Sequence, residues 1–238
     1  MIGLFTDFGC DGLYTGQVRA VLLQGAPGVP IIEVLSNAPK ASPKPSAYLL
    51  AAYCRAYPPG TVFLCVVDPG VGGGRRPVIL EAGGRWFVGP DNGLLAIAAR
   101  RWEGPRWWVI TWRPGRLSAT FHGRDLFAPV AAMLAMGEPL PGEPCAPSPC
   151  PWPDDLPEVV YFDHYGNAIT GLRAASLPQG AGLKVKGLAI PRARTFSDVP
   201  PGHPLCYENA NGLMEIALSS GSAREGLGLA IGDEVEVP

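Results

Sequence analysis

The sequence predicts an α/β protein with two parts: an N-terminal domain built on a mostly parallel layered sheet, and a small C-terminal antiparallel β-barrel. Three observations lead to this prediction. Strand-like apolar runs alternate with helical patterns through the first half of the 238-residue chain, which is typical of parallel sheets. Seven prolines within residues 137–153 then interrupt the pattern. Beyond them, short strands follow one another with turn residues between, as in small barrels.

Turn or capping residues bound each element of the N-terminal part. Apolar runs predict strands at residues 2–5, 31–35, 61–67, 78–80, 85–88 and 107–112. Helical patterns occupy residues 14–24, 45–57, 91–101 and 125–136. The helix at 45–57 begins at a proline, which suits a first turn, and ends before Pro58-Pro59-Gly60. The strands at 78–80 and 85–88 are expected to form a hairpin across Gly83-Gly84.

The C-terminal part contains only short strand patterns, at residues 159–162, 167–172, 183–185, 213–218 and 234–237. We therefore predict one domain over residues 1–140, a proline-rich linker over 141–156 and a second domain over 157–238.

Composition excludes several classes of function. The net charge is −2 and no basic block is present, which argues against nucleic acid as a partner. No apolar run approaches the ~20 residues of a membrane span, and the first residues lead directly into a strand rather than a signal peptide. The six cysteines lack zinc-like spacing, which suits a reducing cytoplasm. We expect a cytoplasmic protein with no membrane association and no metal site.

The most informative stretch is residues 66–76, VVDPGVGGGRR. Asp68 ends an apolar run, and a glycine-rich turn brings Arg75 back past it. Ligands bind at the ends of such strands in open α/β sheets. The turn lacks the Lys-Ser/Thr of a phosphate-binding loop, and Arg75 replaces the third glycine of a dinucleotide fingerprint. The pattern indicates a polar small-molecule site; the alternative is an Asp–Arg pair that only stabilises the turn.

Three other polar positions are candidates, each with a structural alternative. Asp7 follows the first strand, so it should share a sheet edge with Asp68; it could equally cap a helix. His122 precedes a glycine at a helix entry, although a lone histidine is often structural. Residues 163–167 offer carboxylate and amide groups on what could also be a plain β-turn.

An ordered set of motifs then resembles one family. The motifs are TDFG at 6–9, VDPGVG…RR at 67–76, PDNG at 90–93, TFHGRD at 120–125, D-x-x-G-N at 163–167 and N-x-x-G-x-x-E-I-A at 209–217. This set resembles the S-adenosyl-L-methionine hydroxide adenosyltransferases, or SAM hydrolases, which are relatives of the fluorinase and chlorinase that make 5′-halo-adenosines. The resemblance implies a three-layer α/β/α domain, a β-barrel domain, and a homotrimer whose substrate lies between one subunit's N-terminal and its neighbour's C-terminal domain.

The resemblance also implies residue roles. Asp68, Arg75 and His122 would handle the attacking water. The remaining binding residues would be Asp7 for the ribose hydroxyls, Asp163 for the methionine ammonium, Asn167 and Phe196 for the adenine, and Asn209 in the loop near the methionine carboxylate. Residues 36–41 and 209–212 depart from the family's usual pattern.

The implied reaction explains these residue types. Attack on C5′ expels methionine as a neutral thioether, so the leaving group needs no general acid. The water must be held and deprotonated: Arg75 can stabilise negative charge on its oxygen, while Asp68 and His122 accept and orient the proton. No metal or cofactor is needed.

Three alternatives to metal-independent hydrolysis are a halide-using 5′-halo-adenosine synthase, a non-catalytic binder of S-adenosylmethionine or adenosine, and a metal-dependent hydrolase with Asp7, Asp68 and His122 as ligands. The family's halogenases typically carry Tyr where this chain has Asp68 and no histidine where it has His122. A carboxylate repels a halide in a dry pocket, so Asp68 favours water.

Overall fold

The computed structural model describes all 238 residues. The chain divides into two compact units, Met1–Pro151 and Trp152–Pro238. Within the segment predicted as a linker, Gly142–Pro144 form strand β7, which pairs with Arg106–Ile110, strand β6. The proline-rich segment thus begins as an edge strand of the N-terminal sheet.

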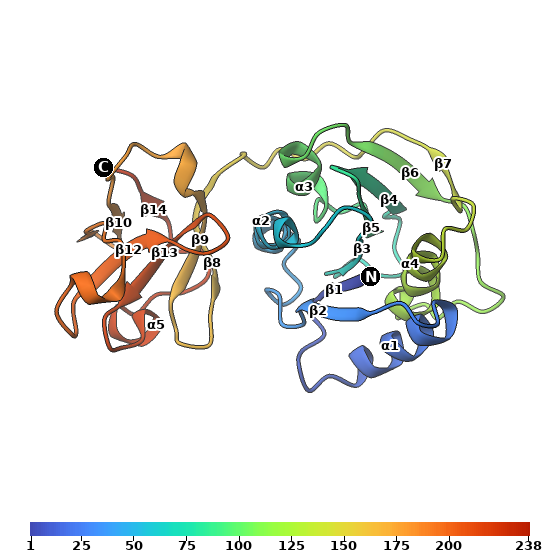
Figure 1. Cartoon of the computed structure of the whole chain (residues 1–238), viewed down its shortest axis with the longest axis horizontal. Coiled ribbons are helices and arrows are strands. Elements are labelled where there is room, and N and C mark those ends of the chain that lie inside the picture. Colours follow the sequence, from blue (N-terminus) through green and yellow to red (C-terminus); the bar gives the residue numbers. More distant parts are fainter. The chain divides into compact units, whose positions relative to one another are not determined.

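The N-terminal unit contains a seven-stranded sheet with the order β2-β1-β3-β5-β4-β6-β7. The other strands are β1 (Ile2–Thr6), β2 (Ile31–Leu35), β3 (Val62–Val66), β4 (Pro77–Ala82) and β5 (Arg85–Pro90). The helices are α1 (Leu13–Gly25), α2 (Pro43–Tyr53), η1 (Cys54–Ala56), α3 (Ala96–Arg101), the π-helical turn η2 (Gly123–Phe127) and α4 (Ala128–Ala135). Figure 1 labels most of these elements.

The sheet is mixed, so the prediction of a mostly parallel sheet is not confirmed. Strands β2, β1, β3 and β5 pair in parallel, whereas β5, β4, β6 and β7 pair antiparallel. The reversal starts at the hairpin across Gly83-Gly84, because so short a connection can join only antiparallel strands. Strand β5 of that hairpin joins the parallel half, and β4 extends the sheet on its far side.

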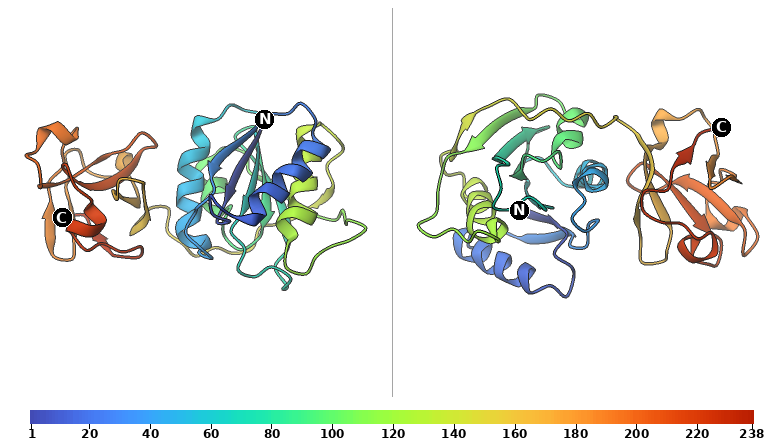
Figure 2. Two further views of the ribbon diagram at one scale, coloured as in Figure 1. Left: turned by 90° about the horizontal axis from the view of Figure 1, so that it is seen from below. Right: turned by 180° about the vertical axis from the view of Figure 1, so that it is seen from behind.

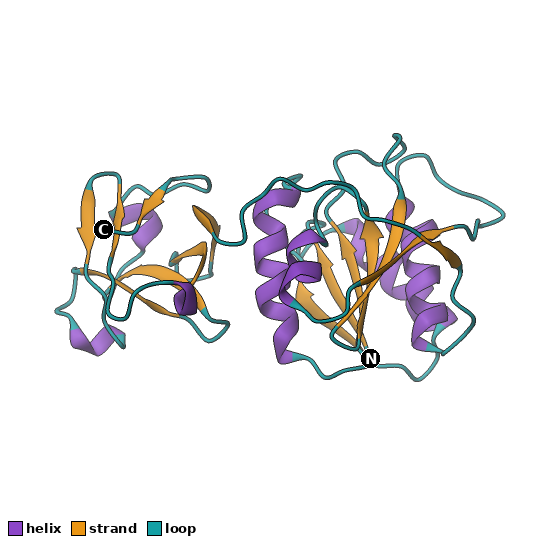
Figure 3. Ribbon diagram, turned by 90° about the horizontal axis from the view of Figure 1, so that it is seen from above, coloured by secondary structure: helices purple, strands orange, loops and turns teal.

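Helices cover both faces of this sheet (Figures 1 and 3). Helices α1 and α4 contact each other on one face, and α2 and α3 contact each other on the other. Strand β3 is completely buried, and its alternate residues Val62, Leu64 and Val66 join the core beneath α1 and α4. A strand buried on both faces reads as a continuous apolar run, which explains the apolar stretch ahead of Asp68.

The C-terminal unit consists of two antiparallel sheets, and Figure 2 shows this unit from two further sides. One sheet has the order β12-β13-β9-β8 and the other β11-β10-β14. Their strands are β8 (Leu156–Phe162), β9 (Ala168–Arg173), β10 (Leu183–Val185), β11 (Leu188–Ile190), β12 (Pro204–Glu208), β13 (Leu213–Leu218) and β14 (Val235–Glu236). Short helical turns are η3 (Ala174–Ser176), η4 (Phe196–Asp198) and α5 (Ala223–Gly226). The closed barrel stays a prediction; β11 and β12 were not predicted.

Two features bear on the expected environment of the protein. No helix has both the length and the apolar character needed to cross a membrane. All six cysteines are unpaired, and Cys54, Cys65 and Cys206 are buried. Burial raises the pKa of the Cys206 thiol to about 11, so this thiol acts as a small apolar group.

Candidate active site

A cavity of about 240 Å³ lies in the N-terminal unit where strands β1 and β3 end. Thr6 and Val66, the last residues of these strands, are register partners, so the residues that follow them emerge side by side. The lining residues come from four loops and are Asp7, Phe8, Lys40, Ala41, Val66, Asp68, Pro69, Val71, Thr120, Phe121, His122 and Gly123. Asp7, Asp68 and His122 thus share one cavity.

Arg75 is not part of this lining, but it connects two of its members. Its Nε donates to both oxygens of Asp68, at 3.0 and 2.9 Å, and its Nη2 donates to the same carboxylate. Nη2 also lies 2.9 Å from Nδ1 of His122, and the guanidinium stacks 5.3 Å from the ring centre of Phe127. The side chains of Arg75 and Asp68 are only 10% and 4% exposed. Arg75 is therefore held on three sides and fixes Asp68 and His122 relative to each other.

These contacts determine the state of the His122 ring. A guanidinium only donates hydrogen bonds, so Nδ1 accepts from Arg75 and the ring proton resides on Nε2. Burial lowers the pKa of His122 from its ordinary 6.5, and the positive charge of Arg75 lowers it further, against the opposing effects of Asp68 and Asp125. At neutral pH the imidazole is neutral and can donate from Nε2.

The turn that carries Asp68 and Arg75 is built on close backbone contacts. Gly72 has a φ of +78°, and a Cβ atom there would lie 2.5 Å from the carbonyl oxygen of Ala119. Only glycine fits both requirements. This contact joins the turn to the segment that precedes His122.

Asp91 and Asn92 clamp the two ends of this turn. Asn92 donates from Nδ2 to the carbonyl of Val67, at 2.9 Å, immediately before Asp68. Asp91 accepts from the Arg76 guanidinium, and its backbone N–H donates to the Arg76 carbonyl at 2.9 Å. The PDNG motif contains both residues, but their role as a clamp comes from contacts across the sheet that the sequence does not show.

A π-helical turn positions His122. The turn spans Gly123–Phe127, and the N–H of Ala128 donates to the carbonyl of Gly123, five residues earlier. Pro129 follows at the start of α4; its ring would clash with the carbonyl of Asp125 in a regular helix, so the backbone widens there. Asp125 accepts from the N–H of Ser118 at 2.8 Å, which ties the loop before His122 to this turn.

Asp7 faces the cavity and does not cap a helix. Helix α1 begins at Leu13 with Gly12 at its N-cap position and has no side-chain cap. The Asp7 carboxylate instead accepts from the N–H of Ala41 at 2.8 Å, and Ala41 has a φ of +52°. Burial raises the pKa of Asp7, with a smaller contribution from the Asp68 charge. The divergent segment 36–41 thus supplies part of the cavity wall.

A second hollow, of about 540 Å³, lies in the C-terminal unit. Its lining contains Asp163, Tyr165, Asn167, Phe196, Tyr207, Leu218, Ser220 and Gly221. The Phe196 and Tyr207 rings lie 5.2 Å apart between centres, and Phe196 is 40% exposed. The structure therefore brings together the three residues predicted to bind adenine and the methionine ammonium, Asn167, Phe196 and Asp163.

Asn209 is not part of that lining. Its Oδ1 accepts from the N–H groups of Asn211 and Leu213, and its Nδ2 donates to Glu215 at 3.0 Å. Glu215 also accepts from the Tyr207 hydroxyl and is only 5% exposed. Sequence reasoning assigned no role to Glu215 or Tyr207, although a glutamate between Met214 and Ile216 in a buried strand was a usable signal.

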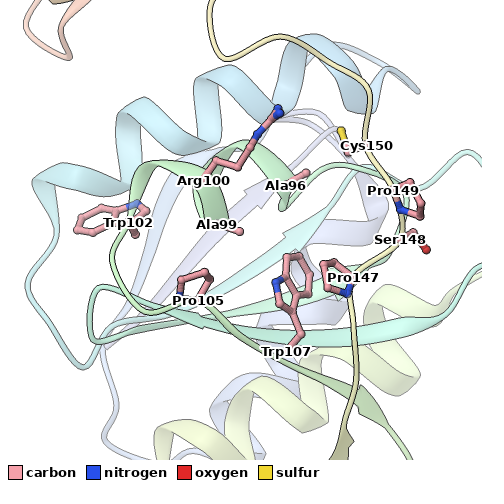
Figure 4. A pocket seen from close by; sticks show the side chains of 10 residues that line it. All are labelled: Ala96, Ala99, Arg100, Trp102, Pro105, Trp107, Pro147, Ser148, Pro149 and Cys150. Carbon is pink, nitrogen blue, oxygen red and sulfur yellow. The ribbon is translucent and has the colours of Figure 1, made fainter.

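Another hollow of the N-terminal unit, about 530 Å³, has a different character. Figure 4 shows its lining, which comes from α3, the loop after it, Trp107 of β6 and residues 147–150. Tryptophan, proline and alanine dominate this wall, and it contains no carboxylate or histidine. The chain has no group of three or more His, Cys, Asp or Glu side chains arranged to hold a metal ion.

Two domain models of one protein family together match almost the whole chain. Residues 2–142 match the SAM hydroxide adenosyltransferase N-terminal domain, and residues 157–236 match the corresponding C-terminal domain. A (R)-S-adenosyl-L-methionine hydrolase from Thermus thermophilus is 42% identical over 98% of this chain and 97% of its own length. A protein of the same name from Salinispora arenicola is 40% identical over 99% and 97%.

More distant relatives and solved structures agree with these matches. A fluorinase from Actinopolyspora mzabensis is 23% identical over 100% of this chain and 96% of its own length. The crystal structure of an uncharacterized conserved protein from Thermotoga maritima superposes with a TM-score of 0.89 at 31% identity, covering 100% of this chain and 99% of the other. The resemblance first seen in the ordered motifs is confirmed, and the chain belongs to the SAM hydroxide adenosyltransferase family.

Proposed function

We propose that this protein hydrolyses S-adenosyl-L-methionine to adenosine and L-methionine by in-line attack of water on C5′. The observation that carries the proposal is the Asp68–Arg75–His122 cluster, joined by hydrogen bonds at one cavity. Relatives that are 42% and 40% identical bear the name (R)-S-adenosyl-L-methionine hydrolase. We extend to this chain both the activity and the (R) configuration at sulfur that the name specifies.

In the proposed mechanism Asp68 and His122 contact the water, and Arg75 acts through them. Asp68 accepts the water's proton as the new C5′–O bond forms, and His122 orients the oxygen by donating from Nε2. Arg75 keeps the Asp68 carboxylate in place and the His122 proton on Nε2. The C5′–S bond breaks with both electrons going to sulfur, so methionine leaves as a neutral thioether. The water oxygen must lie about 3–3.5 Å from C5′, in line with that bond.

Substrate binding is proposed to follow the family's assignments. Asp7 would bind the ribose hydroxyls, and Asp163 the methionine ammonium. Asn167 and Phe196 would hold the adenine. The side chain of Asn209 is engaged in its own turn and with Glu215, so the methionine carboxylate would meet the backbone of residues 209–212 rather than that side chain.

The active protein is proposed to be a homotrimer in which each site combines the N-terminal cavity of one subunit with the C-terminal hollow of a neighbour. A head-to-tail contact of this kind uses two different surfaces and closes into a ring. We also propose that the reaction needs no metal or cofactor. The location is proposed to be the cytoplasm, a prediction supported by the unpaired cysteines.

The Asp68 carboxylate favours hydrolysis over halide transfer. It is 4% exposed and lines the cavity, so a chloride or fluoride beside it would place two anions in a poorly solvated space. A neutral water suffers no such repulsion and gains an acceptor for its proton.

Product analysis tests the proposal against its alternatives. Purified protein is incubated with S-adenosyl-L-methionine in four samples, with and without chloride and with and without a chelator, and the products are separated by chromatography. We expect equal amounts of adenosine and methionine in every sample. Chloride-dependent 5′-chloro-adenosine would establish a halogenase, and loss of activity with chelator a metal-dependent hydrolase. Saturable binding without methionine release would establish a binding protein.

A further inference from the structure

Arg76 and Asp91 lie opposite each other where strands β4 and β5 reach the turn of residues 68–75. Their neighbours Pro77 and Pro90 are register partners of the two strands, and the Asp91 N–H donates to the Arg76 carbonyl at 2.9 Å. The Asp91 carboxylate accepts from Nε of Arg76 at 3.0 Å and also from its Nη2. The Asp91 side chain is only 5% exposed, so its charge depends on such partners.

The proline-rich segment after β7 binds to the same pair. This segment, residues 145–148, still belongs to the N-terminal unit, and we call it the strap. Ser148 donates to the Asp91 carboxylate twice, from Oγ at 2.8 Å and from its backbone N–H at 3.3 Å. The carbonyl of Ala146 accepts from Nη2 of Arg76 at 2.9 Å. The strap and the turn are thus joined through Arg76, Asp91 and Ser148, which we call the latch.

Two consecutive arginines end the turn, and their side chains bind different carboxylates. Arg75 contacts Asp68 and its side chain is 10% exposed, whereas Arg76 contacts Asp91 and its side chain is 40% exposed. Pro77 restricts the backbone of Arg76 to an extended conformation, in which successive side chains point to opposite sides. Fixing Arg76 in the latch therefore fixes the side on which Arg75 emerges.

We infer that Asp91 and Ser148 are positioning residues for the reaction, and that the strap is part of the active-site scaffold as well as the connection between the two units. The latch holds Arg76, and the direction of Arg75 toward its two partners at the cavity follows. The inference rests on the proposed function, which assigns the handling of water to those partners. The sequence pattern alone places the strap in a linker.

The pKa of His122 reports whether Arg75 stays in place. The charged groups around this ring are Arg75 and Asp68 of the turn, Asp125 of η2 with its partner Arg124, and Asp7 and Lys40 of the other cavity loops. Burial and then the charge of Arg75 lower the pKa, so it rises if Arg75 moves away. Loss of the negative charge of Asp91, acting through space, would lower it instead. The sign of a shift therefore separates movement of Arg75 from a change of charge.

The latch is tested with Asp91→Asn, which keeps the shape of the side chain and leaves one acceptor oxygen in place of two. We expect kcat to fall roughly 10- to 100-fold with little change in KM, because small displacements of the groups that hold the water are costly. The acid limb of the kcat/KM profile, which reports the free enzyme, should move to higher pH. An acid limb that stays in place or moves to lower pH would overturn the inference, whatever the loss of activity.

The matched control is Asp155→Asn in the C-terminal unit. Asp155 accepts from Nε and Nη2 of Arg173 at 2.7 and 2.6 Å, so this variant loses an Asp–Arg pair of the same kind outside the latch. It should lower the free energy of unfolding without moving the acid limb. An equal shift in the control would show that the effect does not come from the latch.

Ser148→Ala tests the strap itself, and it decides the question if Asp91→Asn does not fold. Loss of Oγ should lower kcat about threefold and move the acid limb in the same direction. Ser148→Thr keeps the hydroxyl and should behave like the wild type. Ser176→Ala is the control, because it removes an Oγ that donates to the Arg173 carbonyl at 2.8 Å. Wild-type kinetics in Ser148→Ala would overturn the role of the strap.

Failure of the proposed function is recognised separately, as absence of adenosine formation by the wild-type protein. The inference is then decided by nuclear magnetic resonance. The chain has only three histidines, and comparison with His122→Ala identifies the signal of His122. Titration of that signal in Asp91→Asn should give a higher pKa than in the wild type, and an equal or lower value would overturn the inference.

Discussion

At the scale of single residues, the candidate site is organised around Arg75. Its guanidinium contacts the Asp68 carboxylate, Nδ1 of His122 and the ring of Phe127. It is absent from the cavity lining, whereas Asp68 and His122 belong to it. The arrangement supports a division of labour in which Arg75 orients and the other two contact the water. A lysine could not reproduce it, because a single ammonium lacks the planar set of donors.

The first prediction concerns these three residues. Asp68→Asn, Arg75→Ala and His122→Ala should each lower kcat by roughly 10²–10⁴ and change substrate affinity little, because the three act on water rather than on the adenosyl group. Double variants should lose little more than the more severe single variant, since the residues act as a unit. Steady-state kinetics with S-adenosyl-L-methionine provides the check. Near wild-type turnover in Asp68→Asn and His122→Ala would contradict these roles, and Asp7→Ala should instead raise KM.

The second prediction concerns pH. Burial and Arg75 lower the pKa of His122 below its ordinary 6.5, so the ring is neutral at pH 7. Protonating Nδ1 would set an N–H against the Arg75 N–H. We therefore expect kcat/KM to be flat near neutrality and to fall as pH drops through a value below 6.5. The folded protein also binds this proton less readily than the unfolded chain, so stability declines over the same interval. A pH–rate profile with its acid limb at or above 6.5 would contradict this state of His122.

Sequence reasoning could identify Asp68, Arg75 and His122, because motif order and strand ends locate them. It could not identify Glu215 as a partner of Tyr207. These residues lie on different strands, and the pairing of β12 with β13 brings them together. The alternative roles of Asp7 were likewise undecidable from sequence, since they depend on where α1 begins and on the N–H of Ala41.

At the scale of elements, the backbone of the turn of residues 68–75 is constrained at both its ends and its middle. Its ends are clamped by Asp91 and Asn92, and its middle passes against the carbonyl of Ala119 at Gly72. The two clamps come from the loop after β5, and the contact at Gly72 comes from the segment that precedes His122. The turn therefore depends on the packing of the whole sheet edge.

The third prediction compares two glycines of this turn. Gly72→Ala places a Cβ atom 2.5 Å from a carbonyl oxygen at a φ of +78°, so we expect a loss of about 1–3 kcal/mol in the free energy of unfolding together with reduced activity. Gly74→Ala is the matched control, because nothing lies within 4 Å of its Cβ position. Chemical denaturation measures both. Equal effects of the two substitutions would show that the turn has no such constraint.

The main elements follow from local patterns, but the sheet order does not. Buried strands such as Val62–Val66 and the hairpin across Gly83-Gly84 are readable from apolar runs and turn residues. Which strand of the hairpin pairs with β3 is decided by long-range packing, whereas the hairpin itself makes the sheet mixed in either case. Strands β7 and β11 have only three residues each, too few for an alternating pattern, and β12 begins at Pro204.

At the scale of the whole molecule, the candidate residues fall into two groups, one in each compact unit. Under the proposed trimer, each site takes its water-handling residues from one subunit and its adenine-binding residues from a neighbour. Two variants with defects in different units test this division. Asp68→Asn affects the first group and Phe196→Ala affects the second.

The fourth prediction is that mixing these two variants restores activity. Each variant alone should be nearly inactive. After subunit exchange at equal amounts, a site is intact only when its N-terminal unit comes from Phe196→Ala and its C-terminal unit comes from Asp68→Asn. Each of these two conditions is met with a probability of one half, so about a quarter of the wild-type activity should return in a closed ring. A mixture as inactive as its components would mean that each site belongs to a single chain.

The measurement that tests the central claim most directly follows the oxygen of water. Hydrolysis is run in ¹⁸O-labelled water, and both products are analysed by mass spectrometry. Attack on C5′ predicts one ¹⁸O atom in the 5′-hydroxyl of adenosine and none in methionine. Unlabelled adenosine, or label in the methionine fragment, would contradict in-line attack of water on C5′ and with it the proposed function.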